Sequence, residues 1–516
     1  MERIGKVWLT GAGPGSSELL TVKAKRLLSE GDCIVYDRLV GKEVISMIPA
    51  GKELIDVGKR TGRHTIPQEM INEILVREAK RGKKVIRLKG GDPFLFGRGG
   101  EEIEALLRED IPFEVVPGIT SPVAVPSYSG IPVTHRDHVS AVHIVTGHQR
   151  DGGGKKICYK GLVDAGGTLV FLMGVRTLPD IMEGLLDAGM SPDMPAVILQ
   201  DGTVAGQRRV LATVKTLKKE AEEQRIKAPS VIIVGEVCRL AEDFAWREKL
   251  PLFGERIIVT RPNGRGDKLE ERLRELGAEV LSVPVIRTEP VTEKEKLEKI
   301  SRELERLKEY QVLVLTSPYG AERFFQVLTE TGRDMRAAAH MKFAVIGQGT
   351  KDALAARGIV ADFMPERYDG ASLGRLLAEN LGGEGAGKTK VLIARSSLGG
   401  EEILKELREN DSIEYTDLVI YDTVIAEGCS GVLRSCIEER EFTKAVFTSS
   451  STVEGFCRMA GGGSLEGICA VCIGEKTRQA AEMRGMRTVT ALNAGVDELV
   501  ACICNQGKGG GVRKVN

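Results

Sequence analysis

Aromatic residues, net charge and long apolar runs are all scarce in this sequence. Phe, Trp and Tyr make up 4% of the 516 residues, which argues against a protein that stacks single-stranded nucleic acid on aromatic side chains. Lys plus Arg and Asp plus Glu each number 73, so no overall field attracts nucleic acid or an acidic membrane. No apolar run approaches the length of about eighteen residues that a transmembrane helix needs. An anionic substrate would therefore require a local basic patch.

Paired cysteines are scarce as well. The ten cysteines are scattered, and the one Cys-x-x-Cys, formed by Cys469 and Cys472, lies in an apolar run. It lacks a second pair at metal-ligand spacing. These features predict buried thiols in a reducing compartment and no metal site. The first residues enter a strand pattern without a signal-peptide core, so we expect a cytoplasmic protein.

Short apolar runs alternate with amphipathic helical patterns almost throughout the chain. This alternation predicts an α/β fold with mainly parallel sheets. A change to small residues, prolines and hydroxyl residues after position 118 predicts two subdomains in the first half, with a cleft between them. The predicted divisions are subdomains at about 1–118 and 119–245, a linker at 246–254, a second α/β half at 255–505, and a disordered Gly/Lys-rich tail at 506–516.

Two segments of the second half share a pattern. A strand that ends in Thr-Ser occurs at 316–317 and again at 448–449. About thirty residues after each comes Ile-Gly-x-x-Thr, at 346–350 and at 473–477. This repeat predicts two similar subdomains that face each other.

The most unusual stretch is a glycine-rich loop at residues 87–100 (Arg-Leu-Lys-Gly-Gly-Asp-Pro-Phe-Leu-Phe-Gly-Arg-Gly-Gly). It follows a strand pattern and precedes a helical one, which places it at the carboxyl end of a strand, where open α/β sheets bind ligands. Its five glycines expose main chain that can press against a flat ligand. The alternative is a glycine-rich turn that binds nothing.

A second glycine turn, Gly-Ala-Gly-Pro-Gly at 11–15, invites comparison with a dinucleotide-binding loop. Asp37 closes the next strand pattern, where a ribose-binding acid would lie. Two residues argue against a dinucleotide. Ser16 stands where the third glycine belongs, and Pro14 lacks the N–H that a pyrophosphate cradle needs. The turn therefore suits a ligand without a pyrophosphate.

Several long motifs of the first half occur together and in order. They are Val-Trp-Leu-Thr-Gly-Ala-Gly-Pro-Gly at 7–15, Val-Tyr-Asp-Arg-Leu-Val at 35–40, Val-Gly-Lys-Arg at 57–60, the loop at 87–100, Val-Val-Pro-Gly-Ile-Thr at 115–120, Ser-Gly-Ile-Pro-Val-Thr-His-Arg-Asp at 129–137 and Val-Thr-Gly-His at 145–148. Over about residues 1–245 these motifs resemble the uroporphyrinogen-III C-methyltransferase family. The resemblance implies two α/β subdomains with a cleft between them, usually in a homodimer. It also implies that S-adenosylmethionine methylates two ring carbons of uroporphyrinogen III to give precorrin-2.

The same resemblance implies a binding site for the methyl donor. Its residues would be Pro14, Gly90, Gly91, Asp92, Leu95, Thr120, Ser121, Met173 and Gly202. Three positions depart from the common family pattern: Leu95 is often isoleucine, Ser121 is often alanine, and Ser16 is often aspartate. A methionine at a strand end, such as Met173, is otherwise by default a core residue.

Proton transfer and substrate binding are implied in the same way. The family places a proton acceptor at Asp37 and a proton donor at Lys59. The alternatives are a strand-end or helix-cap carboxylate for Asp37 and, for Lys59, a solvated lysine that only pairs with a substrate carboxylate. Arginine forks suit the carboxylates of the substrate. The candidates, each of which could instead be a surface residue, are Arg38, Arg60, Arg63, Arg98 and Arg136.

The second half, about residues 254–505, resembles the uroporphyrinogen-III synthase family in shorter motifs. These are Val-Thr-Arg-Pro at 259–262, Val-Pro-Val-Ile at 283–286, Leu-Thr-Ser-Pro at 315–318, Ile-Gly-Gln-Gly-Thr at 346–350, Val-Ile-Tyr-Asp-Thr at 419–423, Phe-Thr-Ser-Ser at 447–450 and Ile-Gly-Glu-Lys-Thr at 473–477. The resemblance implies two flavodoxin-like subdomains joined by paired connecting strands near 284–290 and 418–424. One subdomain would then combine 255–285 with 424–505, and the other would span 290–418.

That family closes linear hydroxymethylbilane into uroporphyrinogen III with inversion of the last ring, and no metal or organic cofactor is implied. The substrate supplies its own reactive azafulvene, so the protein mainly positions it. By resemblance the main candidate is Tyr421, supported by Thr350 and Thr477, with Ser317 and Ser449 behind them. The alternatives are helix N-caps for Thr350 and Thr477 and a linker-packing aromatic for Tyr421.

Together the two resemblances imply a bifunctional enzyme of the sirohaem and cobalamin pathways, in which the second half makes the substrate of the first. The expected partners are small tetrapyrroles and a second copy of the methyltransferase half, without nucleic acid or membrane. No dehydrogenase–chelatase segment is recognised, so iron insertion would belong to another protein. The rival hypothesis is a methylase of a later corrin intermediate fused to a ligand-binding module without catalysis.

Overall fold

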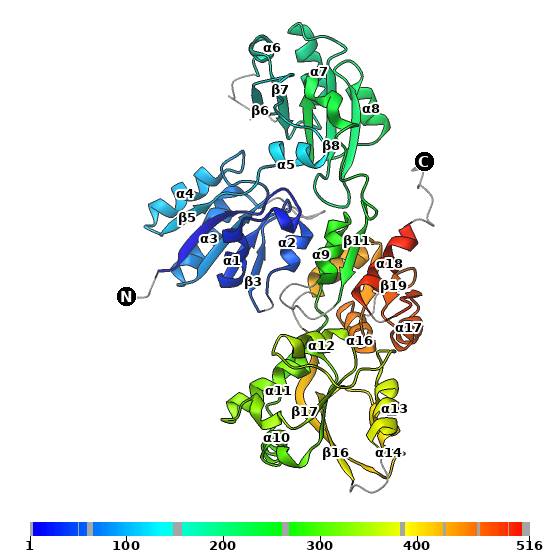
Figure 1. The fold of residues 1–516 in the computed structure, drawn as a ribbon. Helices are drawn as coiled ribbons and strands as arrows, with labels where there is room; N and C mark the ends of the chain where they lie inside the picture. The colour runs from blue at the N-terminus through cyan, green and yellow to red at the C-terminus, as the bar shows by residue number, and fades with distance from the viewer. Residues whose placement is uncertain are drawn as a thin grey trace. The chain divides into compact units, whose positions relative to one another are not determined.

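The computed structural model describes residues 4–49, 51–58, 66–147, 157–260, 268–381, 388–426, 430–461, 465–493 and 495–507. Contacts group the chain into two compact units. The first comprises Met1–Ile258, Glu270–Ser282 and Gly428–Thr443, and the second Val259–Leu269, Val283–Glu427 and Lys444–Asn516. Within these described residues, four five-stranded sheets form the framework (Figure 1). This architecture confirms the predicted α/β fold class, and the predicted subdomain boundaries stay predictions.

The first sheet is parallel throughout, in the order β3-β2-β4-β1-β5. Its strands are β1 (Lys6–Gly11), β2 (Cys33–Tyr36), β3 (Glu53–Asp56), β4 (Lys84–Lys89) and β5 (Phe113–Val116), with helices α1 (Val22–Glu30), α2 (Lys42–Ser46), α3 (Gln68–Lys80) and α4 (Gly99–Arg108) and the 3₁₀ turn η1 (Ser17–Leu19). The inner strands are apolar on both faces because both faces are covered by helices. Since β1 and β4 are direct neighbours, the two glycine turns leave the sheet side by side.

The second sheet is mixed, in the order β6-β7-β10-β8-β9. Its strands are β6 (Val142–Thr146), β7 (Thr168–Leu172), β8 (Pro195–Gln200), β9 (Arg208–Thr213) and β10 (Ser230–Val234), with α5 (Ser121–Tyr128), α6 (Tyr159–Ala165), α7 (Leu178–Asp187), α8 (Leu217–Glu223) and the 3₁₀ helix η2 (Glu236–Ala241). β10 lies antiparallel between β7 and β8, and β9 is antiparallel to β8. This sheet departs from the parallel arrangement that the sequence predicted. Strand β9 is not among the predicted strands, because its two leading arginines hide the short apolar run.

The third sheet has the order β12-β11-β18-β19-β20. Its strands are β11 (Arg256–Val259), β12 (Glu279–Ser282), β18 (Lys444–Phe447), β19 (Cys469–Cys472) and β20 (Arg487–Thr490), with α9 (Lys268–Glu275), α15 (Ser430–Glu438), α16 (Ser450–Met459), α17 (Glu475–Glu482) and α18 (Val496–Gly507). β18, β19 and β20 pair in parallel. The Cys-x-x-Cys pair, Cys469 and Cys472, forms the two ends of β19 and is buried, as the sequence indicated.

The fourth sheet has the order β13-β17-β16-β14-β15. Its strands are β13 (Ile286–Pro290), β14 (Val312–Leu315), β15 (Lys342–Val345), β16 (Thr389–Ser396) and β17 (Ile413–Ile425), with α10 (Lys294–Glu305), α11 (Pro318–Glu330), α12 (Gln348–Ala355), α13 (Gly370–Leu381), α14 (Glu402–Arg408) and the 3₁₀ turns η3 (Leu307–Glu309) and η4 (Met335–Ala338). β13 pairs antiparallel with the end of β17, from Ile286 opposite Ile425 to Pro290 opposite Tyr421. This ribbon coincides with the connecting strands expected near 284–290 and 418–424, and long β17 continues it into the sheet (Figure 1).

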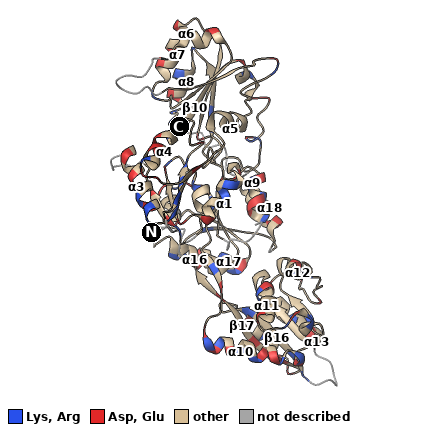
Figure 2. Ribbon diagram, turned by 90° about the vertical axis from the view of Figure 1, so that its left-hand side faces the viewer, with Lys and Arg blue, Asp and Glu red and all other residues tan. Residues whose placement is uncertain are grey.

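Charges of both signs are interspersed on the helices. Figure 2 shows basic and acidic residues together along α10 and α17, in line with the equal totals of the two signs. Many of these residues form exposed ion pairs one helical turn apart, for example Arg478 with Glu482 at 2.6 Å, and such pairs contribute little to stability. Among the residues described, none of the helices combines the length and apolar character needed to span a bilayer.

Candidate active sites of the two halves

The two glycine turns of the first half meet in a small β-bridge. Gly13 and Gly91 exchange main-chain hydrogen bonds of 3.2 and 2.7 Å, and the N–H of Ala12 donates to the carbonyl of Lys89 at 2.7 Å. The N–H groups of Ala12, Gly13 and Gly91, which a pyrophosphate cradle could use, therefore already donate within the protein. This geometry agrees with the sequence argument that the turn suits a ligand without phosphate.

Three main-chain segments approach closely at this edge of the sheet. A Cβ on Gly118 would lie 2.2 Å from the carbonyl oxygen of Gly91, and a Cβ on Gly90 would lie 2.6 Å from the Cβ of Leu39. Gly91 has a φ of +70°, and the place where its Cβ would stand has no heavy atom within 4 Å. The turn is thus tight on the protein side and open on the other, as a cradle for a ligand requires.

The carboxylate of Asp92 organises this loop. One oxygen accepts hydrogen bonds from the N–H groups of Phe94 at 2.8 Å and Leu95 at 3.3 Å, and the other accepts from the N–H of Gly118 at 3.0 Å. Asp92 thereby ties the loop after β4 to the loop after β5. Its side chain shapes the predicted methyl-donor site through these main-chain contacts.

The remaining predicted methyl-donor residues lie on neighbouring loops. Thr120 is the N-cap residue of α5 and Ser121 its first helical residue. A Cβ on Gly202 would lie 2.3 Å from the side chain of Val125 in α5, so the loop at 201–204 packs against that helix. Met173 follows β7 with a φ of +55° and leaves 52% of its surface exposed, which is unusual for a core methionine.

Asp37 stands directly after β2. Its Oδ1 accepts a hydrogen bond from the N–H of Leu39 at 3.0 Å, and its Oδ2 lies 3.5 Å from Nη2 of Arg87. The next helix, α2, has Gly41 as its N-cap, so the helix-cap alternative for Asp37 is wrong. It is a strand-end carboxylate at the same sheet edge as the glycine turns.

The predicted substrate arginines are found at different kinds of position. Arg38 follows Asp37 and is exposed. Arg98 is also exposed and forms a double hydrogen bond with Glu101 at 2.7 and 2.8 Å. Arg136 lies in an exposed turn closed by the N–H of His135 donating to the carbonyl of Val139 at 3.1 Å. Lys59, Arg60 and Arg63 lie outside the described residues.

In the second half, the candidate residues Tyr421 and Ser317 lie together. Their hydroxyl groups are 2.8 Å apart, and Tyr319 packs edge-on against the Tyr421 ring with centroids 4.9 Å apart. Burial raises the pKa of Tyr421, although Ser317 and Ser396 hydrogen-bond to it and oppose that shift. The phenol therefore stays protonated at neutral pH and is able to donate a hydrogen bond.

The N-cap residues of α11, α12, α16 and α17 are serines and glycines, not the threonines that the alternative interpretation named. Ser317 caps α11 by accepting from the N–H of Gly320 at 2.9 Å, and Ser449 caps α16 by accepting from the N–H of Thr452 at 3.3 Å. The caps of α12 and α17 are Gly347 and Gly474. The N-cap alternative for Thr350 and Thr477 is therefore wrong. Both threonines are buried residues in the first turn of these helices.

Two hydroxyl residues near Tyr421 escaped the sequence analysis. Ser396, the last residue of β16, and Thr423 on β17 have their hydroxyl oxygens 2.6 Å apart. Ser396 also hydrogen-bonds Tyr421. The signal that could have found Ser396 is the Ser-Ser-Leu-Gly-Gly sequence at 396–400, a hydroxyl at a strand end followed by a glycine turn.

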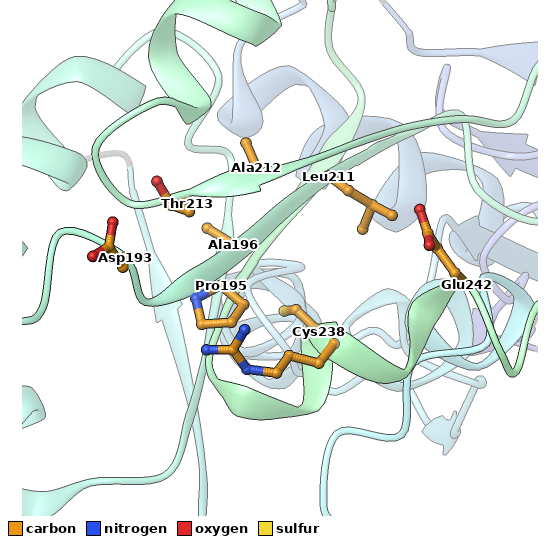
Figure 3. Close-up of a pocket in the computed structure, with 9 residues that line it drawn as sticks. Asp193, Pro195, Ala196, Leu211, Ala212, Thr213, Cys238 and Glu242 are labelled. Carbon is orange, nitrogen blue, oxygen red and sulfur yellow. The ribbon is translucent and has the colours of Figure 1, made fainter.

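One further pocket of about 210 Å³ lies at the edge of the second sheet (Figure 3). Its lining comes from β8, β9 and η2 together with the flanking residues Asp193 and Glu242, and it contains none of the predicted site residues. Cys238 in its wall is buried, which raises the pKa of the thiol to about 12, so it is a poor nucleophile. Arg239 is already paired with Glu236 at 2.6 Å.

Three potential metal ligands also converge, but cations surround them. Ligand atoms of Cys33, Glu53 and Glu78 lie within 4.8 Å of one another. Glu78, however, is bound by Lys83 at 2.6 Å and by Arg77 at 2.8 Å. A positive ion would have to displace these partners, so the arrangement fits an ion-pair cluster better than a metal site.

Comparison with known proteins identifies the two halves. Residues 6–218 match the family of tetrapyrrole (corrin/porphyrin) methylases, and residues 267–501 match uroporphyrinogen-III synthase HemD. Over 505 residues the chain is 45% identical to the porphyrin biosynthesis protein HemD of Ruminiclostridium josui, an alignment that covers 98% of this chain and 99% of that protein. The chain belongs to this HemD family. It is a fusion of a tetrapyrrole methylase domain with a uroporphyrinogen-III synthase domain, as the sequence analysis predicted.

Further relatives match the methylase half alone. The chain is 50% identical over 239 residues to an S-adenosyl-L-methionine-dependent uroporphyrinogen III methyltransferase of Methanosarcina barkeri, covering 46% of this chain and 93% of that protein. It is 49% identical over 245 residues to the siroheme synthase of Ectopseudomonas mendocina, covering 48% of this chain and about half (53%) of that enzyme. A crystal structure of uroporphyrin-III C-methyl transferase from Thermus thermophilus complexed with S-adenyl homocysteine is 41% identical, with a TM-score of 0.40, covering 46% of this chain and 99% of that one.

Proposed function

We propose that this chain catalyses two consecutive steps of tetrapyrrole biosynthesis. The synthase half closes hydroxymethylbilane to uroporphyrinogen III with inversion of the last ring, and the methylase half converts that product to precorrin-2 with S-adenosylmethionine. The observation that carries the proposal is the match of the whole chain to one porphyrin biosynthesis protein, with each half matching its own enzyme family.

The open cradle beside Gly91 supports S-adenosylmethionine as the methyl donor. The donor has an adenine, a ribose, a sulfonium and an amino acid group but no phosphate, and the main-chain N–H groups of Ala12 and Gly13 are used inside the protein. The open space at Gly91 leaves room for such a ligand. The proposed binding residues are Pro14, Gly90, Gly91, Leu95, Thr120, Ser121, Met173 and Gly202, with Asp92 holding the loops in place.

In this half the protein orients the methyl donor and the tetrapyrrole and transfers protons. When bound, the donor supplies an electrophilic methyl group. Asp37, at the same sheet edge, accepts a proton from the tetrapyrrole, and Lys59 returns one. Arg38, Arg60, Arg98 and Arg136 bind the substrate carboxylates. These assignments follow the family pattern, and the position of Asp37 after β2 is compatible with them.

In the synthase half the hydroxyl cluster around Tyr421 supports substrate positioning. A neutral phenol beside Ser317 and Ser396 donates hydrogen bonds to the bilane as the last ring turns over. Ser449 caps α16, while Thr350 and Thr477 lie in the first turns of α12 and α17. All three are therefore placed where main-chain N–H groups favour carboxylates. No step requires a resident metal.

The proposal also includes the state of the protein in the cell. The methylase half is proposed to form a homodimer, and the protein is proposed to work in the cytoplasm. Light scattering on the intact chain tests the first point, because a mass near 56 kDa would contradict the dimer.

The decisive experiment feeds hydroxymethylbilane and S-adenosylmethionine to the intact chain and follows the products by mass and by isomer analysis. The expected product is the dimethylated tetrapyrrole of the type III series. Formation of the type I isomer alone would contradict the synthase assignment. Accumulation of unmethylated type III product would contradict the methylase assignment and favour a later corrin substrate.

A further inference from the structure

A buried cluster of charges adjoins Asp37. It consists of Arg87 and Lys89 on β4 and Glu102 on α4, which are 2%, 4% and 0% exposed. Nε of Arg87 donates to Oε1 of Glu102 at 2.9 Å, and the ammonium of Lys89 donates to the same oxygen at 3.0 Å. Gln68 also donates to it, at 3.3 Å, while the other oxygen, Oε2, is buried without a partner in the described structure. Glu102 is therefore the centre of the cluster.

The guanidinium of Arg87 contacts two carboxylates, those of Glu102 and Asp37. Its Nη1 donates to the carbonyls of Leu88 at 3.1 Å and Val35 at 3.3 Å, which fixes the plane of the group. Its Nε is 2.9 Å from Glu102, whereas its Nη2 is 3.5 Å from Asp37. A separation of 3.5 Å is the outer limit of hydrogen bonding, so Arg87 binds Glu102 more strongly than it binds Asp37.

We propose that Glu102 competes with Asp37 for Arg87 and in this way keeps the Asp37 carboxylate basic enough to accept the substrate proton. This inference rests on the proposed role of Asp37. In the proton transfer, the proton leaves the tetrapyrrole for a carboxylate oxygen of Asp37, the bonding electron pair stays on the ring system, and bulk water later removes the proton. A tight pair between Arg87 and Asp37 would stabilise the carboxylate and weaken it as a base. Arg87 and Glu102 are thus positioning residues.

The other charges near Asp37 set the direction of the expected effects. Arg38 follows it in the chain, Asp56 ends β3 beside β2, and Lys89 is on β4 next to Arg87; Lys59, Arg60 and Arg63 are outside the described residues. Burial lowers the pKa of Lys89, the charge of Arg87 lowers it further, and Glu102 opposes both effects. Without the charge of Glu102, Asp37 would be the only carboxylate that the described structure places against Arg87.

The test compares pH profiles of methyl transfer for Glu102→Gln and Arg87→Gln in the intact chain. Glu102→Gln is expected to move the acid limb of kcat/KM to lower pH by about one unit and to reduce the plateau rate about threefold, because the base is weaker. Arg87→Gln is expected to move the acid limb to higher pH by a similar amount. Glu104→Gln, an exposed glutamate on the same helix, is the matched control and leaves the profile unchanged.

Opposite shifts from two touching residues are a result that a merely structural role would not produce. Shifts in the same direction, or profiles that coincide with the wild type, would overturn the inference. If Glu102→Gln fails to fold, Glu102→Asp takes its place, because the shorter side chain loosens the hold on Arg87 and must also move the acid limb to lower pH. Asp37→Asn separates the proposed role of Asp37 as a base from the proposed competition for Arg87. Retained methyl transfer in that variant would refute the proposed role of Asp37, whereas lost transfer with unshifted profiles would refute only the competition.

Discussion

The hydrogen bonds of Asp92 allow a quantitative prediction for Asp92→Asn. The carboxylate accepts three main-chain N–H groups, two on one oxygen and that of Gly118 on the other. An amide keeps one acceptor oxygen for Phe94 and Leu95 but turns an NH₂ group toward the N–H of Gly118. One charge-assisted hydrogen bond is lost, at a cost of about 1.5 to 3 kcal/mol. If the whole loss falls on the ligand-bound state, methyl-donor affinity decreases roughly 10- to 150-fold.

Calorimetry with S-adenosylhomocysteine, the demethylated donor, measures this loss directly. The synthase half of the same chain is an internal control, because ring closure of hydroxymethylbilane is expected to keep its wild-type rate. Asp187→Asn, at the exposed end of α7, is the matched control substitution. Affinity within threefold of the wild type would show that the Gly118 tether does not shape the site. A parallel loss of ring closure would refute the independence of the two sites.

Three further substitutions test other parts of the reasoning. Tyr421→Phe removes the hydroxyl that lies 2.8 Å from Ser317 and is expected to slow ring closure about tenfold without affecting methyl transfer; an unchanged rate of type III formation would exclude the phenol from the reaction. Gly91→Ala places a methyl group in the open cradle at a φ of +70° and is expected to cost about 1 to 2 kcal/mol in backbone strain and to abolish calorimetric binding of the demethylated donor, so tight binding would rule out the cradle. Burial raises the pKa of Glu78, but Lys83, Arg77 and Arg81 outweigh it and lower the value from 4.5 to about 2. Because the folded-state pKa is depressed, this carboxylate stabilises the fold above about pH 4.5 and loses its contribution between pH 4.5 and 2. Urea unfolding of Glu78→Gln should then show at most about 3 kcal/mol less stability at pH 7 and little difference near pH 2, and a constant difference across that range would contradict the assignment.

The sequence predicted the parts of the molecule that depend on local chemistry. A glycine-rich loop after an apolar run has few conformations other than a turn at a sheet edge. The structure has such a loop at residues 90–98, whereas residues 87–89 of the predicted stretch belong to β4 and residues 99–100 belong to α4. The family resemblance named Tyr421 and Ser317 as separate candidates, but only the structure shows that their hydroxyl groups lie 2.8 Å apart. The caps were harder to assign. The Ile-Gly-x-x-Thr pattern is compatible with a threonine N-cap. In the structure, Gly347 and Gly474 are instead the N-cap residues, in extended conformation, and Thr350 and Thr477 lie in the first helical turn.

What the sequence could not predict depends on contacts distant in the chain. Arg87 and Glu102 are fifteen residues apart, and their hydrogen bond forms only when the fold brings one residue of β4 and one of α4 together. In the same way, the antiparallel insertion of β10 between β7 and β8 is set by how the second sheet assembles, since its apolar residues would suit a parallel strand equally well. Ser396 reaches Tyr421 only because β16 and β17 are neighbours.

The strand β17 has two tasks at once. Its end pairs with β13 in the two-stranded ribbon, and the same stretch carries Tyr421. Because Tyr421 belongs to this ribbon, any bending of the ribbon would also change the direction of its hydroxyl group. Solvent viscosity, which slows bending but not bond chemistry, should therefore register in the rate of ring closure and leave methyl transfer untouched.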